Sequence, residues 1–240
     1  MAALEDSSAG RLIGVLVSPA KTFQSIAGRP TWGVALVILV LLGVGIGQLV
    51  NARTDQRQMI EKQIAKFGQH LSQEDLDKAV ARAKNPSPVL RALSVVTGGL
   101  FQALIYLLPA ALFFIIFKLA GSELTFKSSF STYLYTSVPL ALAVLLSIPV
   151  VLSRATVQPV DAMTGRLLAS SPSFFLPEGA GMALRGALSS FDIFNLWSVV
   201  LAVVGYRIVA RVSTTAAVAA ALVLFLLGMG LRALTASFLG

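Results

Sequence analysis

Few side chains in this sequence have the types and spacing that catalysis or metal binding requires. The chain has no cysteine, which excludes thiolate metal sites and cysteine nucleophiles. Its one histidine, His70, has no second ligand-type residue at metal-binding spacing. A P-loop and a GxGxxG dinucleotide motif are also missing from the sequence. We therefore expect a solvated His70, no cofactor or metal ion, and no enzymatic activity.

A second set of candidate residues consists of polar side chains inside long apolar stretches, where unpaired polar atoms are costly. These residues are Gln48, Gln102, Tyr106, Tyr133, Tyr135 and Asn195. We expect no charged side chain near the middle of these stretches, although ion- or proton-coupled carriers generally place one there. An autonomous secondary transporter is therefore the less favoured hypothesis.

Five apolar stretches must position these groups. Four of them carry no charge and can cross a hydrocarbon layer of about 30 Å, namely 32–50, 96–117, 128–153 and 212–231. The fifth, 193–206, would reach only about 21 Å, so it must recruit flanking residues. Charged residues make up 12% of the chain, against about 25% in a soluble domain. The sequence therefore predicts an all-α, polytopic membrane protein with five transmembrane helices.

The segments between and around these helices follow from turn and capping signals. Residues 10–27 form two short amphipathic pieces hinged at Ser18 and Pro19, which is typical of a helix lying at the membrane interface. The prolines of 154–189 exclude a further span there. The predicted order is an interfacial segment (1–31), a first transmembrane helix (32–50), an extramembrane helical hairpin (51–92), transmembrane helices (93–118 and 127–153), a membrane-surface loop (154–189) and two last transmembrane helices (190–210 and 212–232).

The hairpin at 51–92 is the only long hydrophilic stretch. Gly68 is a candidate stop for its first helix, and Ser72 is a candidate N-cap for its second. Ser87 and Pro88 predict that the second transmembrane helix begins several residues before the membrane. The hairpin is too small for a catalytic domain, so we expect a docking surface or a cover for one end of the bundle.

Net charge and small residues limit the partners. The net charge is +8, but the 19 lysines and arginines are spread among short segments that flank the spans. This favours contact with anionic membrane lipids over nucleic acid. With the N-terminus inside, seven of these cations are cytoplasmic and twelve are outside, so charge does not favour that orientation. Gly43 and Gly47 have the spacing for close helix packing, either within the chain or in a homo-oligomer.

Three groups of short motifs resemble the Yip1-domain membrane proteins in their order and spacing. They cover about residues 10–235, and the residues that carry the likeness are Ser18, Pro19, Phe23, Gly121, Pro139, Asp192, Phe194, Trp197 and Gly205. The resemblance implies a five-span protein of the bacterial inner (cytoplasmic) membrane with a cytoplasmic N-terminus. Some bacterial members of this family accompany ABC exporters and their membrane-fusion adaptors. From the residues alone, Asp192 can cap the fourth helix, Trp197 can anchor it, and Gly205 permits a close helix approach.

Three functional hypotheses remain. The leading one is a non-enzymatic accessory or assembly subunit that binds other membrane proteins, an ABC transporter or its adaptor. An alternative is a lipid-binding or membrane-organising protein, in which residues 10–27 and the apolar region around Phe174 insert into opposite leaflets. A second alternative is a homo-oligomeric channel or transporter that uses the face of Gly43 and Gly47.

Overall fold

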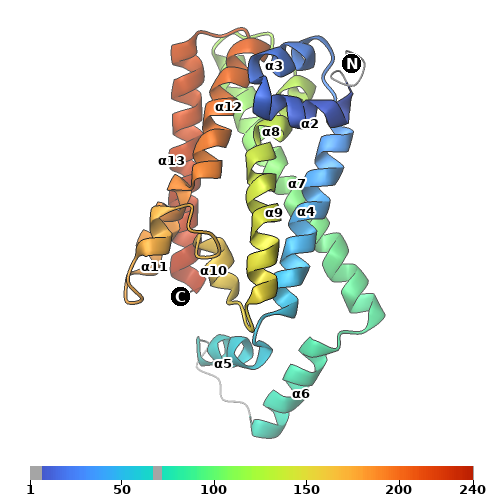
Figure 1. Cartoon of the computed structure of the whole chain (residues 1–240), viewed down its shortest axis with the longest axis vertical. Helices are drawn as coiled ribbons and strands as arrows, with labels where there is room; N and C mark the ends of the chain where they lie inside the picture. The colour runs from blue at the N-terminus through green and yellow to red at the C-terminus, as the bar shows by residue number, and fades with distance from the viewer. Residues whose placement is uncertain (1–6, 67–71, 240) are drawn as a thin grey trace.

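The computed structural model describes residues 7–66 and 72–239, and this part of the chain forms helices and contains no β-strand (Figure 1). The predicted stop at Gly68 and the solvated His70 lie outside the described residues. The elements are α2 (Ser8–Val17), α3 (Pro19–Gly28), α4 (Gly33–Ala52), α5 (Gln56–Lys66), α6 (Gln73–Lys84), α7 (Pro88–Leu119), α8 (Phe126–Thr136), α9 (Val138–Ser153), α10 (Pro159–Met163), η1 (Pro172–Phe175), α11 (Met182–Leu188), η2 (Ser189–Phe191), α12 (Ile193–Val209) and α13 (Thr214–Leu239).

Four helical runs are long and apolar enough to cross a membrane. They are α4, α7, α8 together with α9, and α13. The 17 residues of α12 make a fifth span when they are taken with residues 182–191, from which α12 bends by 52°. The all-α, polytopic fold with four to five candidate spanning helices is thereby confirmed.

Prolines lie within the long helices and next to the break between α8 and α9. Ser137 ends α8 and begins α9, and Pro139 follows in the first turn of α9. Because proline has no N–H, it cannot donate to the carbonyl four residues earlier, that of Tyr135. Pro109 lies inside α7 and Pro149 inside α9. The third span is therefore two helices in series.

The N-terminal pair α2 and α3 lies across one end of the bundle (Figure 1). Its apolar face packs on the protein, because Val15, Phe23 and Ile26 are fully buried in one cluster with Leu134 and Leu201. Ile13 and Val17 remain exposed. The core of this end therefore combines residues that are far apart in the sequence.

The polar pair α5 and α6 lies at the opposite end of the bundle (Figure 1). Ser72 caps α6 by accepting a hydrogen bond from the Asp75 N–H at 3.2 Å, and Ser87 caps α7 in the same way, as predicted. Next to this end, the Arg53 guanidinium donates to the Arg154 carbonyl oxygen at 3.1 Å. The Val157 N–H donates to the Arg53 carbonyl oxygen at 2.9 Å. These bonds fasten the end of α4 to the segment that follows α9.

The segment between α9 and α12 packs against the side of the bundle. Its helix α11 lies on α13 so closely that a Cβ atom at Gly186 would stand 2.4 Å from the Arg232 carbonyl oxygen. Arg185 is buried and donates to the carbonyl oxygens of Pro177 and Ala180. The segment is therefore held against the C-terminal part of α13, and α12 begins part-way along the bundle (Figure 1).

Candidate functional site

Two residues of the sequence motifs bring the N-terminal pair close to the bundle. A Cβ atom at Gly205 of α12 would stand 2.8 Å from the Phe23 ring and 2.9 Å from the Thr132 methyl carbon. Phe23 and Thr132 are fully buried. Glycine at 205 therefore makes the notch that receives the Phe23 ring, and α3 sits directly on α12.

A buried arginine holds the two N-terminal helices together. The Arg11 guanidinium donates to the Arg29 carbonyl at 2.8 Å, to the Thr31 hydroxyl at 2.9 Å and to the Ser25 hydroxyl at 2.7 Å. The buried Tyr135 adds its hydroxyl group, which lies 3.4 Å from the Thr31 hydroxyl. Neutral oxygen atoms thus accept hydrogen bonds from the charged guanidinium, which lowers the cost of burying it. The network fixes the entry into α4.

Asp192 begins α12 and links it to the preceding segment. One carboxylate oxygen accepts from the N–H groups of Phe194 at 2.9 Å and Asn195 at 3.3 Å, which is the capping geometry predicted from the sequence. The other oxygen accepts from the Ser170 hydroxyl. The Asn195 amide donates to the Ser190 carbonyl at 2.8 Å. Hydrogen bonds and the positive end of the helix dipole together stabilise the carboxylate.

A cavity of about 460 Å³ lies beside this cap, in the interior of the bundle. Residues of α4, α7, α8, α9, α12 and α13 line it, together with parts of the segment from 165 to 189. Its polar side chains are Gln102, Tyr106, Tyr133, Ser147, Ser170, Ser189, Asp192, Asn195, Arg232 and Thr235. Four of the six polar residues noted within the apolar stretches, all except Gln48 and Tyr135, therefore meet at one place.

Gly43 forms part of the same cavity wall. A Cβ atom at Gly43 would stand 2.5 Å from the amide carbon of Gln102, so the glycine makes room for that side chain. The Gln102 amide in turn donates to the Tyr106 hydroxyl at 3.2 Å. Gly47 is exposed, and a Cβ atom there would meet no other atom within 4 Å. Within this pair, only Gly43 packs closely inside the chain.

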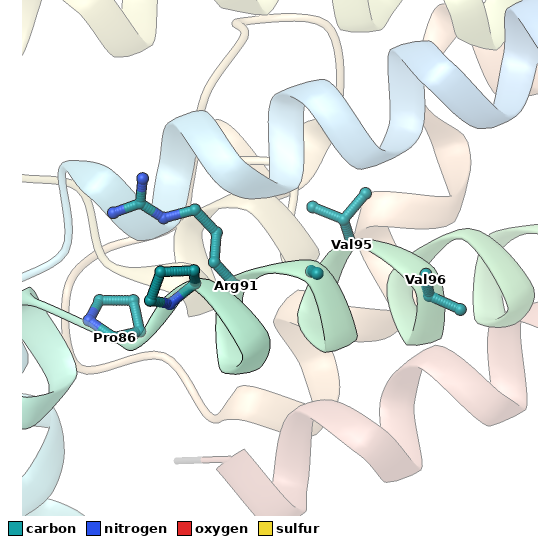
Figure 2. A pocket seen from close by; sticks show the side chains of 6 residues that line it. Pro86, Arg91, Val95 and Val96 are labelled. Carbon is teal, nitrogen blue, oxygen red and sulfur yellow. The ribbon is translucent and has the colours of Figure 1, made fainter.

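A second hollow, of about 500 Å³, lies along the first turns of α7 (Figure 2). Pro86, Arg91 and Val95 help to line it, and Figure 2 shows the Arg91 and Val95 side chains on the same side of the helix. Every residue from 87 to 97 is exposed, including apolar ones such as Val89. We call residues 87–97 the α7 arm. It extends away from the rest of the bundle.

The helical hairpin next to the arm is held by charged groups at its surface. Arg57 of α5 contacts Asp77 of α6 at 2.7 Å and Glu61 at 3.2 Å, and it donates to Gln73 at 2.8 Å. The hydrogen bond from Arg57 to Asp77 is the main cause of the raised pKa of Arg57. Arg57 thus ties α5 to α6 from one side.

Comparison with known proteins places this bundle in a family. The family model for the Yip1 domain matches residues 13–234. The chain belongs to the Yip1 domain family. The membrane protein YknW of Bacillus subtilis (strain 168) is similar, with 28% identity over 215 residues, which cover 89% of this chain and 84% of YknW. No solved structure matches the chain.

Within this Yip1 domain, the motif residues fall into two structural groups and a remainder. Phe23 and Gly205 meet at the N-terminal end, where Ser18 and Pro19 form the junction of α2 and α3. Asp192 lies in the cavity wall. The others are spread out: Gly121 has φ +83° in the turn after α7, Pro139 is buried at the α8–α9 break, Phe194 is half-buried and Trp197 is exposed on α12.

Sequence reasoning misses one of the two charged residues of the cavity, Arg232. The uncharged run ends at residue 231, so the sequence places Arg232 at the end of the last span. The helix continues to Leu239, which places Arg232 inside it. Residues 231–239 contain neither glycine nor proline, and that is the available signal for a longer helix. The buried position of Arg11 has no comparable signal, because it depends on the fold of α3 over α2.

Proposed function

We propose that this Yip1 domain protein is a non-enzymatic accessory or assembly subunit of the bacterial inner membrane that binds an ABC-type exporter or its adaptor. The α7 arm carries the proposal. Its exposed residues include the apolar Val89, Leu90 and Leu93, and nothing else in the described chain covers them. Exposed apolar surface that is bordered by polar groups is typical of a protein-binding site.

The hairpin adds an extramembrane part to the same surface. Its helices α5 and α6 precede the arm directly and carry mixed charges, including the ion pairs of Arg57 with Asp77 and of Lys78 with Glu74. A partner that touches both the arm and the hairpin would be a membrane protein with a domain or adaptor outside the bilayer. With the N-terminus in the cytoplasm, the hairpin faces the periplasm, where such an adaptor would stand.

The homo-oligomeric channel has less support from the geometry. Gly43 is covered by Gln102 of the same chain, so the face of Gly43 and Gly47 is only half available to a second copy. Pairing between copies through Gly47 alone would lack the second small residue that close helix packing uses. The α7 arm offers another protein a longer exposed surface than this glycine face does.

Site-specific photo-cross-linking in native membranes tests the proposal. A photoreactive residue is placed at Val89 or Leu93 on the arm, and at Leu222 or Leu226 on the exposed face of α13 as matched controls. We expect cross-links to one membrane protein from the two arm positions and none from α13. Cross-links to lipid alone from the arm, or equal protein cross-links from α13, would reject the arm as the docking surface.

Deletion of the hairpin tests its separate contribution. Residues 56–84 are replaced by a flexible Gly/Ser linker, and the tagged protein is purified in mild detergent with whatever remains bound. The control reverses the charge of two exposed lysines that flank the turn between α7 and α8, at the other end of the bundle. These substitutions are Lys118→Glu and Lys127→Glu. We expect at least about tenfold less bound partner for the deletion and no change for the control. Unchanged recovery would remove the hairpin from the proposal.

A further inference from the structure

The cavity lies within the membrane-spanning part of the bundle. Gly43 lines it and is the middle residue of α4, whose 20 residues span about 30 Å. The antiparallel pair of α12 and α13 places Arg232 within the membrane-spanning part as well. The 17 residues of α12 cover about 25 Å, so its start lies beside Arg232 and well before the end of the 26-residue α13.

Arg232 brings a positive charge to this cavity. Its guanidinium donates to the Ser189 carbonyl oxygen at 3.2 Å and makes no ion pair with any described residue. Arginine has five N–H donors, so most of them remain available on the cavity side. A charged group within a membrane protein is costly unless an opposite charge or several hydrogen bonds stabilise it.

Asp192 lines the same cavity but does not fill this role. Its two oxygens already accept from two backbone N–H groups and from the Ser170 hydroxyl. It attracts Arg232 electrostatically without direct contact. The carboxylate is therefore committed to capping α12, and the guanidinium can still take an anionic oxygen.

The remaining lining is divided between polar and apolar side chains. Tyr133 and Asn195 are among its polar side chains, whereas Leu39 and Val144 are among its apolar walls. The volume of about 460 Å³ is within the range of about 300–1,000 Å³ that small-molecule sites occupy. A ligand that fits both walls has a polar head and an apolar tail.

The cavity also borders the lipid. Ile105 lines it and is 43% exposed on the outside of α7. Helix α13 packs mainly on α11 and α12 and only slightly on α7, so the contact between α7 and α13 is the weakest part of the wall. An amphiphile can reach the cavity from the bilayer through this side without crossing water.

We propose that this cavity binds an anionic amphiphile from the membrane, whose phosphate or carboxylate head group pairs with Arg232 and whose tail lies between α7 and α13. Arginine suits this role because its planar guanidinium can donate two parallel hydrogen bonds to such a group. The site is separate from the α7 arm and does not depend on partner binding.

Native mass spectrometry of the full chain in detergent tests the proposal. The probes are phosphatidylglycerol, phosphatidylcholine and inorganic phosphate, and the variants are Arg232→Gln and the exposed control Arg207→Gln. We expect the unmodified protein to bind phosphatidylglycerol more tightly than the other two probes. Arg232→Gln should weaken that binding by about tenfold to a hundredfold, because a charge-assisted pair is lost, and Arg207→Gln should leave it unchanged.

A third variant keeps the test decisive if Arg232→Gln folds poorly. Ala143→Phe fills the cavity from the α9 wall without touching the arginine, and it should also weaken phosphatidylglycerol binding at least about tenfold. Equal binding of both lipids, or equal loss in the Arg232 and Arg207 variants, would overturn the proposal. Inorganic phosphate that binds as tightly as phosphatidylglycerol would also overturn it, because a free anion would then be the ligand.

Discussion

At the scale of single residues, Gly205 controls how closely the N-terminal helices approach the bundle. The variant Gly205→Ala would place a methyl group 2.8 Å from the Phe23 ring, so we expect a loss of about 1–3 kcal/mol from overpacking. Thermal unfolding in detergent should show a lower Tm. Gly230→Ala on α13 is the control, since nothing lies within 4 Å of that position, and its Tm should not fall.

The coupling between Gly205 and Phe23 can be measured in the same assay. Phe23→Leu removes part of the ring that the new methyl group would meet, so the double variant should lose less stability than the sum of the two single variants. Strictly additive losses would show that the two residues do not constrain each other. The sequence motif would then need another explanation than this contact.

Asp192 gives a second residue-scale prediction. Asp192→Ala removes the side-chain acceptor from two N–H groups of α12 and should cost about 0.5–2 kcal/mol, whereas Asp192→Asn keeps an acceptor oxygen and should cost clearly less. Chemical unfolding in mixed micelles measures the difference. If both variants lose the same stability, the negative charge matters more than the cap.

At the scale of elements, the pair α2 and α3 is expected to detach as one unit. Arg11→Ala removes hydrogen bonds to Ser25, Arg29 and Thr31, and a hydrogen bond to a charged group contributes about 1.5–3 kcal/mol. Hydrogen exchange in residues 8–28 should then accelerate at least about tenfold. Gln24→Ala, at an exposed position on α3, should leave the exchange rates unchanged. Faster exchange throughout the bundle would instead indicate global destabilisation.

The elements also show what the sequence can predict and what it cannot. Local signals are sufficient for the α2–α3 junction at Pro19 and for the caps at Ser72 and Ser87, because each depends on a few neighbouring residues. The cavity is not predictable in this way. Its polar residues come from five of the long helices and from the segment before α12, and the role of Arg232 depends on the level at which α12 starts beside α13. Only packing in three dimensions sets that level.

At the scale of the whole molecule, the two ends differ in how tightly they pack. Residues 129–139 of α8 and the start of α9 are buried except for Tyr133, and the turns after α7 and α12 are joined there by a bond of 2.6 Å from the Ser122 hydroxyl to the Ala210 carbonyl. At the other end, the α7 arm is fully exposed. The bundle therefore has one sealed end and one open end, and the proposed partner surface lies at the open one.

The opposite placement of these ends predicts a labelling pattern across the membrane. The chain has no native cysteine, so single cysteines at the exposed positions Ala27, Ala81 and Ala120 can be labelled without background. Ala27 and Ala120 belong to the sealed end, and Ala81 belongs to α6. In spheroplasts, a membrane-impermeant maleimide should label Ala81→Cys and spare the other two, because the proposed orientation puts the N-terminus in the cytoplasm. The inverse pattern would reverse that orientation, and labelling of all three would contradict a bundle that spans the membrane.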